Sequence, residues 1–194
     1  MAYKIRKING TPRLDALSVA KIIDYPLEER DYKPFAQCAA CISGGRLYIR
    51  MWAFEAMPAI SSELRGVLHL FKDTSLALNL RLYVKEQMMV LPECEAFLSR
   101  DGERTADIAG YELHNHSGED LQGIYWGGLV EIDLQKLAEM GGETLTNTGD
   151  KFTGNFYKLC GDEKYAHCGS FYPAKFPAEP YSRESMGDFE VIGG

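Results

Sequence analysis

The sequence predicts an all-β fold, a two-sheet antiparallel β-sandwich with one or two short helices. Alternating apolar and polar residues recur in short segments, which is typical of strands with one buried face. Glycine and proline residues separate these segments, as they separate the strands of sandwiches and barrels. The chain has 194 residues, 45% apolar and 25% charged. We therefore expect residues 1–194 to form one domain that needs neither disulfides nor metal for stability.

The clearest strand pattern lies at residues 75–84. Every second position is a large apolar residue: Leu76, Leu78, Leu80, Leu82 and Val84. The positions between them are Ala77, Asn79, Arg81 and Tyr83. A helix would scatter the leucines around its axis, whereas a strand gathers them on one face, which we expect to point into the core.

A hairpin is predicted before this strand. Residues 35–42 and 46–55 both have strand patterns, and Ser43-Gly44-Gly45 between them is typical of a tight turn. In the second arm one face has Leu47, Ile49, Met51 and Ala53, and the other has Tyr48, Arg50, Trp52 and Phe54. Further strands are expected at residues 67–71, 110–116, 126–134 and 188–192, and a short helix at 134–140 that ends at Gly141-Gly142.

The net charge and the first seven residues of the chain bear on its binding partners and its location in the cell. The net charge of −7 and the pI near 5.2 argue against nucleic acid and against an anionic membrane surface, since both favour a cationic face. The first seven residues lack the apolar core of a signal peptide, and no later run is long enough to span a bilayer. We therefore expect a cytoplasmic protein.

The five cysteines are predicted to be reduced, buried thiols. An odd number fits a cytosolic protein without disulfides. Cys38-Ala-Ala-Cys41 has the spacing of a zinc knuckle or a redox pair. Residues three apart on a strand point to opposite faces, however, so we expect the two sulfurs to diverge and to bind no metal.

His114-Asn115-His116 is the second candidate metal site. Residues two apart on a strand share a face, so both imidazoles could approach one ion, with Glu112, Glu119 or Asp120 as a third ligand. A solvated loop explains this composition equally well. The chain also has no phosphate loop, dinucleotide-binding glycine pattern or nucleophile elbow. We therefore expect no cofactor, no metal and no enzyme activity.

The outer faces of the predicted strands carry a different kind of candidate site. The residues concerned are Tyr48, Arg50, Trp52, His69, Asn79, Arg81 and Tyr83. Aromatic rings stack on the apolar faces of sugars, and Arg, Asn and His side chains bond their hydroxyl groups. The alternative is that the outer faces of a sandwich are simply polar, with scattered aromatic residues.

The C-terminal third resembles the family 9-like carbohydrate-binding modules. The segments that carry the resemblance are GDKFTGNFYK at residues 149–158, Cys160-Gly161-Asp162, Ala166-His167, Ser170-Phe171-Tyr172-Pro173 and Met186-Gly187-Asp188-Phe189. Earlier segments agree in order and spacing, so the resemblance covers most of the chain from about residue 18. It implies a β-sandwich related to the immunoglobulin-like class.

The resemblance also implies a sugar slot between two tryptophans, lined by a Glu, an Arg and an Asn. This chain departs from that pattern. The region of the first tryptophan is Ser62-Glu63-Leu64-Arg65, the Glu position is His69, and the second tryptophan is Phe171. The family's R-x-N becomes Ala77-Leu78-Asn79. Trp52 or Trp126 could replace the lost wall from another direction.

Three hypotheses follow. The first is a non-catalytic domain that binds a mono- or oligosaccharide through Trp52, His69, Asn79 and Phe171, with Arg50 and Arg81 in support. The second is a standalone interaction or structural sandwich that has lost the sugar slot. The third is a metal-dependent enzyme centred on His114 and His116.

Overall fold

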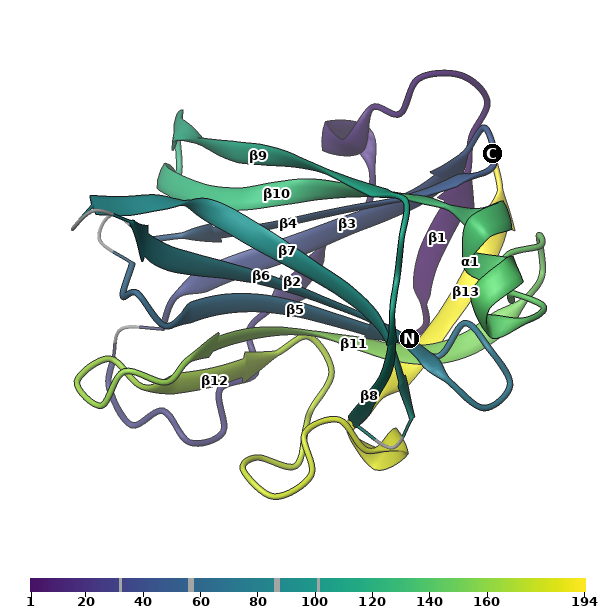
Figure 1. The fold of residues 1–194 in the computed structure, drawn as a ribbon. Helices are drawn as coiled ribbons and strands as arrows, with labels where there is room; N and C mark the ends of the chain where they lie inside the picture. The colour runs from purple at the N-terminus through teal and green to yellow at the C-terminus, as the bar shows by residue number, and fades with distance from the viewer. Residues whose placement is uncertain (32, 56–57, 86–87, 101) are drawn as a thin grey trace.

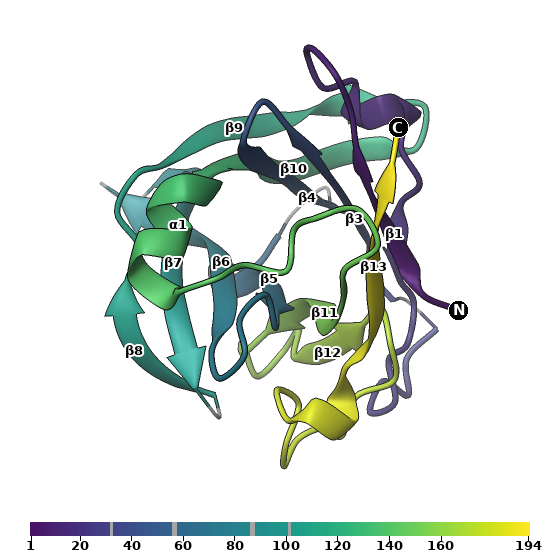
Figure 2. The same ribbon diagram turned by 90° about the vertical axis from the view of Figure 1, so that its right-hand side faces the viewer.

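The described part of the chain forms one sheet of 13 strands that curls around a central core (Figure 2). This computed structural model describes residues 1–31, 33–55, 58–85, 88–100 and 102–194, and describes residues 83–85 and 88–91 only by their place in strands. The strands are β1 (Tyr3–Lys7), β2 (Ala20–Ile22), β3 (Phe35–Ser43), β4 (Arg46–Phe54), β5 (Ser62–Leu68), β6 (Ser75–Lys85), β7 (Met88–Arg100), β8 (Glu103–Asp107), β9 (Tyr111–Asp120), β10 (Gly123–Asp133), β11 (Lys151–Cys160), β12 (His167–Ser170) and β13 (Gly187–Gly193). The helices are α1 (Leu134–Gly141) and two 3-10 turns at Leu14–Ala16 and Arg183–Ser185.

Neighbouring strands follow the order β8-β7-β6-β5-β11-β13-β1-β3-β4-β10-β9, with β12 paired to β11 and β2 to β3. The all-β prediction is confirmed. The two expected layers are two parts of this one curled sheet, with β3, β4, β9 and β10 on one side of the core and β5, β11 and β12 on the other (Figure 1). The sheet is mixed rather than antiparallel throughout, because β1 lies parallel to both β13 and β3.

The alternation predicted at residues 75–84 is confirmed wherever the side chains are described. Leu76, Leu78, Leu80 and Leu82 are buried in the core. The last two members of the pattern, Tyr83 and Val84, lie outside the residues whose side chains are described. The sheet thus has one apolar face turned inward along β6.

The hairpin of β3 and β4 is also confirmed. Gly44 and Gly45 have φ angles of 55° and 74°, a left-handed conformation that glycine adopts without strain. The register sets Cys38 opposite the core residue Met51 and Cys41 opposite Tyr48 on the outer face. The predicted divergence of the two thiols is therefore confirmed.

Other elements differ from the prediction in extent. The strand expected at residues 67–71 is β5, which begins at Ser62 and ends at Leu68. There the chain turns, because the Leu70 N–H donates to the Leu68 carbonyl at 2.9 Å. Leu70 and Phe71 consequently both enter the core instead of facing opposite sides. The pattern also did not predict β7 and β8.

The short helix is confirmed, and it covers one end of the curled sheet (Figure 2). The Asp133 carboxylate caps α1 by accepting hydrogen bonds from the N–H groups of Gln135 and Lys136. Gly142 ends it with a φ of 93°. Leu137 is the buried residue of α1, so the helix closes the core on this side.

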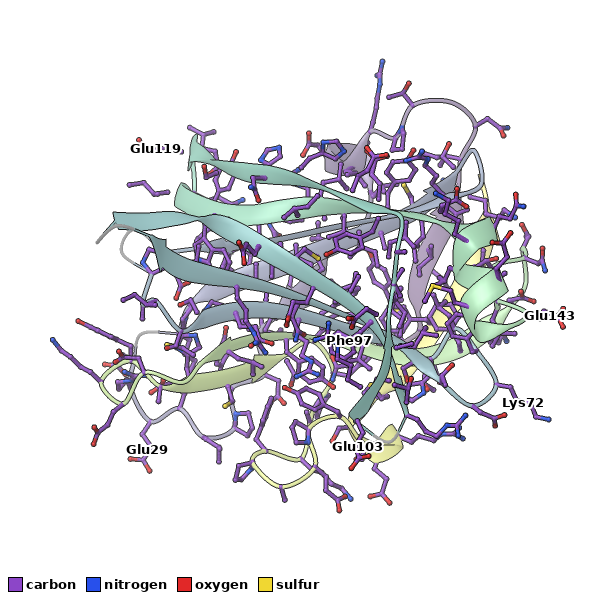
Figure 3. The ribbon with its side chains drawn as sticks, viewed as in Figure 1. Glu29, Lys72, Phe97, Glu103, Glu119 and Glu143 are labelled. Carbon is purple, nitrogen blue, oxygen red and sulfur yellow. The ribbon has the colours of Figure 1, made fainter. Side chains whose placement is uncertain are left out.

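Charged side chains project from the periphery of the sheet, as Glu29, Lys72, Glu119 and Glu143 show in Figure 3. Within the described ranges, none of the helices has the length and apolar character needed to cross a lipid bilayer.

Candidate functional site

The outer face of β5, β6 and β7 carries a row of polar side chains. Because residues alternate along a strand, the inward leucines leave Glu63, Arg65, Asn79 and Arg81 on the outer face. The cross-strand register sets Arg65 opposite Asn79, and Glu63 opposite Arg81. On β7, Glu95 is the partner of Asn79. Three neighbouring strands therefore present arginine, asparagine and carboxylate groups side by side.

The loop at residues 171–186 forms a wall beside this face. Its Tyr181 ring lies 3.9 Å from the guanidinium carbon of Arg65, in cation–π contact. Burial raises the pKa of Tyr181, so its hydroxyl stays protonated at neutral pH and can act as a hydrogen-bond donor. The loop thus brings an aromatic ring against the Arg65 guanidinium on this face.

Two residues of β11 hold the loop in place. Asn155 is fully buried, and its Nδ2 donates to the carbonyls of Tyr172 at 2.9 Å and Ser185 at 2.7 Å. Its Oδ1 accepts from the Tyr172 N–H at 2.9 Å. The Tyr157 hydroxyl donates to the Pro180 carbonyl at 2.6 Å, and its ring meets Tyr181 edge to face at 5.2 Å. The Asn155–Lys158 segment that carries the resemblance therefore fixes both ends and the middle of this loop.

Two cavities lie on either side of Tyr181, which lines both of them. The first, the His69 cavity, has a volume of about 380 Å³ and is lined by Arg65, Val67, His69, Ser75, Ser99, Gly102, Ala178, Glu179, Pro180, Tyr181, Ser182 and Arg183. The second, the Arg81 cavity, has a volume of about 520 Å³, and its lining includes Glu63, Arg81 and Phe176. Both volumes suit a small ligand.

Unsatisfied polar atoms gather around these cavities. Seven buried side-chain N or O atoms in the described part of the chain have no hydrogen-bond partner there, and four belong to this face and its loop. They are Arg65 Nε, Glu63 Oε1, Asn79 Oδ1 and Ser182 Oγ. Such atoms are rare in folded proteins and call for water, an ion or a ligand as their partner.

Arg81 and Arg104, two other charged residues of this face, are paired with carboxylates. Arg81 lies 3.0 Å from Glu63 and 3.6 Å from Glu95. Arg104 of β8 lies 3.4 Å from Glu95 and also pairs with Asp107. These partly exposed pairs form a chain of alternating charge across β5, β6, β7 and β8.

Three of the six predicted binding residues lie at this face. His69 lines the first cavity, and its Nδ1 is 2.9 Å from the Ser75 hydroxyl. Arg81 lines the second cavity. Asn79 is 2% exposed and lies on the strand between them. The structure therefore places His69 and Arg81 at two different cavities of this face, with the buried Asn79 on the strand between them.

The remaining three predicted residues lie elsewhere. Phe171 packs against Tyr3 at 5.8 Å and Tyr172 at 4.3 Å, and it lines neither cavity. Arg50 and Trp52 are on β4, which four strands separate from β5 in the sheet. The six residues do not converge, because alternation predicts the face of a residue but not which strands become neighbours. Sugar binding by Phe171, Arg50 and Trp52 stays a prediction.

Neither tryptophan supplies a wall for the two cavities. Trp52 is 6% exposed and lies under the Arg50 guanidinium, 4.4 Å from its ring centroid. Trp126 is 5% exposed, and its indole N–H donates to the buried Glu55 at 2.8 Å. Sequence reasoning missed Tyr181, whose one signal was an aromatic residue directly after Pro180 in a loop.

A buried polar network surrounds Glu55 inside the curled sheet. The fully buried Lys158 has its Nζ 3.2 Å from Glu55 Oε2 and donates to His167 Nε2 at 2.9 Å. Burial lowers the pKa of Lys158, although the Glu55 charge opposes this shift. Burial and the Lys158 charge lower the pKa of His167 to about 4. His167 is therefore neutral at pH 7, and its Nδ1 donates to the Tyr165 carbonyl at 2.8 Å.

The two histidines of β9 have separate partners. His114 Nε2 lies 3.1 Å from Glu131, whereas His116 stacks on Tyr125 at 5.8 Å. Burial, followed by the charge of Arg50, lowers the pKa of His116. Among the described residues, no three His, Cys, Asp or Glu side chains are grouped so that they could hold a metal ion.

Known proteins resemble this chain in fold. No family model and no curated protein matches the sequence. A candidate carbohydrate-binding protein from Bacteroides uniformis ATCC 8492 is 14% identical, with a TM-score of 0.71 over 98% of both chains. A family 9 carbohydrate-binding module from Caldicellulosiruptor kristjanssonii matches in its complexes with glucose and with cellotriose. Each is 10% identical to this chain and covers 98% of it. The glucose complex has a TM-score of 0.55, with 96% of its own chain covered. The cellotriose complex has a TM-score of 0.53, with 94% of its own chain covered. The chain therefore has a fold like that of the family 9 carbohydrate-binding modules.

Proposed function

We propose that this protein is a non-catalytic carbohydrate-binding domain, with its sugar site at the outer face of β5 and β6 beside the 171–186 loop. The observation that carries the proposal is the group of four buried, unsatisfied polar atoms around the two cavities. Sugar hydroxyls both donate and accept hydrogen bonds, so one sugar can satisfy an arginine N–H and an asparagine oxygen together. The likeness to modules that bind glucose and cellotriose supports this choice of ligand.

In this proposal Tyr181 provides the apolar wall of the site. A pyranose ring in either cavity packs against Tyr181, while His69 bonds hydroxyls in the first cavity and Arg81 does so in the second. The buried Asn79 lies on the strand between the two, and its unsatisfied Oδ1 is a further acceptor. The Arg65 stack and the Tyr157 edge contact hold the tyrosine ring in one orientation before the sugar arrives. Such preorganisation lowers the entropic cost of binding.

Calorimetric titration with xylose, with glucose, galactose, mannose and the uronic acids of these three hexoses, and with soluble oligosaccharides of these sugars tests the proposal. We expect a Kd on the order of 10–1000 μM, because a shallow site contacts only one or two sugar rings. Tyr181→Ala is expected to weaken binding about tenfold, since an aromatic contact contributes about 1 kcal/mol beyond its buried area. Asn79→Ala is expected to cost about 1 kcal/mol or more through lost hydroxyl bonds.

Tyr165→Ala is the matched control, because Tyr165 is a half-exposed tyrosine in the turn before β12 and lines neither cavity. This variant is expected to bind sugar as the unaltered protein does. If no sugar in the panel binds at millimolar concentration, the proposal fails. The second hypothesis, a structural or interaction domain without a sugar slot, would then hold.

A further inference from the structure

Arg65 differs from the other arginines on the outer face of β5–β8. Arg81 and Arg104 each have two carboxylate partners. Within the described residues, no carboxylate lies at ion-pair distance from Arg65, which instead lies over the rings of Tyr181 at 3.9 Å and Phe97 at 5.9 Å. A guanidinium with aromatic neighbours and no carboxylate partner can form an ion pair with an anionic ligand.

Partial burial makes this unpaired charge more costly. Arg65 is partly buried and its Nε is a buried donor without a partner in the described part of the chain. The Phe97 ring on β7, whose centroid is 5.9 Å from the Arg65 guanidinium carbon, is 4% exposed, so it keeps water from that side of the guanidinium. Partial desolvation raises the cost of an uncompensated charge, and a carboxylate that bonds the guanidinium offsets this cost.

In its described lining, the His69 cavity has more arginine than carboxylate side chains, although the protein has a net charge of −7. Among the described lining residues, the basic ones are Arg65, His69 and Arg183. The one described carboxylate is that of the exposed Glu179. The unsatisfied hydroxyl of Ser182 lies in the same lining. The cavity therefore combines a positive field with hydroxyl-bonding groups and the Tyr181 ring.

We propose that the His69 cavity selects an acidic sugar, a uronic acid whose carboxylate pairs with Arg65. This inference rests on the proposed function and adds the class of sugar to it. The pyranose ring packs against Tyr181, and the carboxylate satisfies the guanidinium in the fork geometry that arginine favours. Ser182, whose unsatisfied hydroxyl lies in the same lining, bonds a hydroxyl group of the same sugar. Neutral sugars bind the same surface without this ion pair.

Matched sugars isolate the carboxylate. Glucose, galactose and mannose are each titrated beside glucuronic, galacturonic and mannuronic acid, which differ from them at C6 alone. We expect the acid of at least one pair to bind about ten- to a hundredfold more tightly, as a charge-assisted hydrogen bond of about 1.5–3 kcal/mol requires. Raising the salt concentration is expected to reduce that preference. Sodium acetate is the third arm, and it is expected to bind at least tenfold more weakly than the preferred acid.

Arginine variants test whether Arg65 causes the preference for the acidic sugar. Arg65→Gln is expected to remove the difference between acid and neutral sugar, while Arg65→Lys keeps the charge and part of the difference. Arg104→Gln is the matched control, because Arg104 also lies over Phe97, at 4.8 Å, but is paired with carboxylates. This control is expected to keep the full preference. Thermal unfolding of each variant shows that the fold is intact.

The possible failures are distinguishable. If neutral and acidic sugars bind equally, or if Arg65→Gln and Arg65→Lys both keep the preference, the acidic sugar is wrong while sugar binding stands. If acetate competes as well as the uronic acid, the cavity is a simple anion site and the acidic sugar is also wrong. If neither member of any pair binds, both this inference and the proposed function fail.

Discussion

Removing the Glu55 carboxylate tests the account of the buried network. Glu55→Gln keeps the shape of the side chain but leaves the Lys158 ammonium without its counter-charge, in a position that is fully buried. Breaking a buried ion pair in this way costs about 3–5 kcal/mol. We therefore expect the free energy of unfolding, measured by urea titration at pH 7, to fall by that amount.

The stability lost in Glu55→Gln is expected to depend on pH. Burial already lowers the pKa of Lys158 below its ordinary value, and removing Glu55 removes a charge that raised it. Between the folded pKa and the unfolded pKa of about 10.4, the unfolded chain binds more protons than the folded one. The stability of Glu55→Gln is therefore expected to recover as the pH rises from 7 towards 10.

Two comparisons make the result decisive. Glu190→Gln removes a carboxylate from the partly exposed pair with Lys4 and is expected to change stability little. The double variant Glu55→Gln, Lys158→Met is expected to be more stable than Glu55→Gln alone, because no unpaired charge remains. A loss of less than about 1 kcal/mol in Glu55→Gln would refute the reasoning that this pair is charged and desolvated.

Three further outcomes are expected. Leu78→Asp should abolish cooperative unfolding followed by circular dichroism, because Leu78 is 1% exposed and the new carboxylate would be buried without a partner; a folded, cooperative variant would refute the strand assignment. Because the pKa of His167 is lowered to about 4, the unfolded chain binds an extra proton between about pH 6.5 and that value, so stability should fall as the pH falls through this window. His167→Gln should flatten that part of the stability profile, and an unchanged slope would contradict the assigned pKa. Phe171→Ala should lower stability by about 2 kcal/mol through its lost contacts with Tyr3 and Tyr172. If the variant loses stability and keeps its Kd for sugar, the predicted binding role of Phe171 is wrong; if it loses binding at unchanged stability, Phe171 contacts the sugar.

Periodicity predicted which face each strand buries, and it did so well where the sequence alternates cleanly. The leucines of β6 and the apolar face of β4 are both in the core, because hydrophobic burial and a two-residue repeat leave no other arrangement. The hairpin turn and the ends of α1 followed in the same way from Gly44-Gly45, Asp133 and Gly142.

The order of the strands in the sheet could not be predicted from the sequence. The pairing of β1 with β13 joins residues more than 180 positions apart in the chain, and no local pattern encodes it. For the same reason, alternation placed Trp52 and His69 on the outer faces of their strands but did not show that four strands separate β4 from β5. Tyr181 escaped notice because loops have no periodicity, and its place depends on the bonds that Asn155 and Tyr157 make to the loop backbone.

The place of β1 in the sheet also constrains when the fold can be completed. β1 lies between β13 and β3, and β13 in turn is the strand that joins β1 to β11. During synthesis the edges of β1 and β11 that face β13 stay unpaired until residues 187–193 have left the ribosome. Pairings between such distant segments close slowly, because the entropy of a long loop must be lost before any contact forms. The nascent chain therefore exposes two strand edges until β13 has been made, and in that period edge-to-edge association between copies competes with folding.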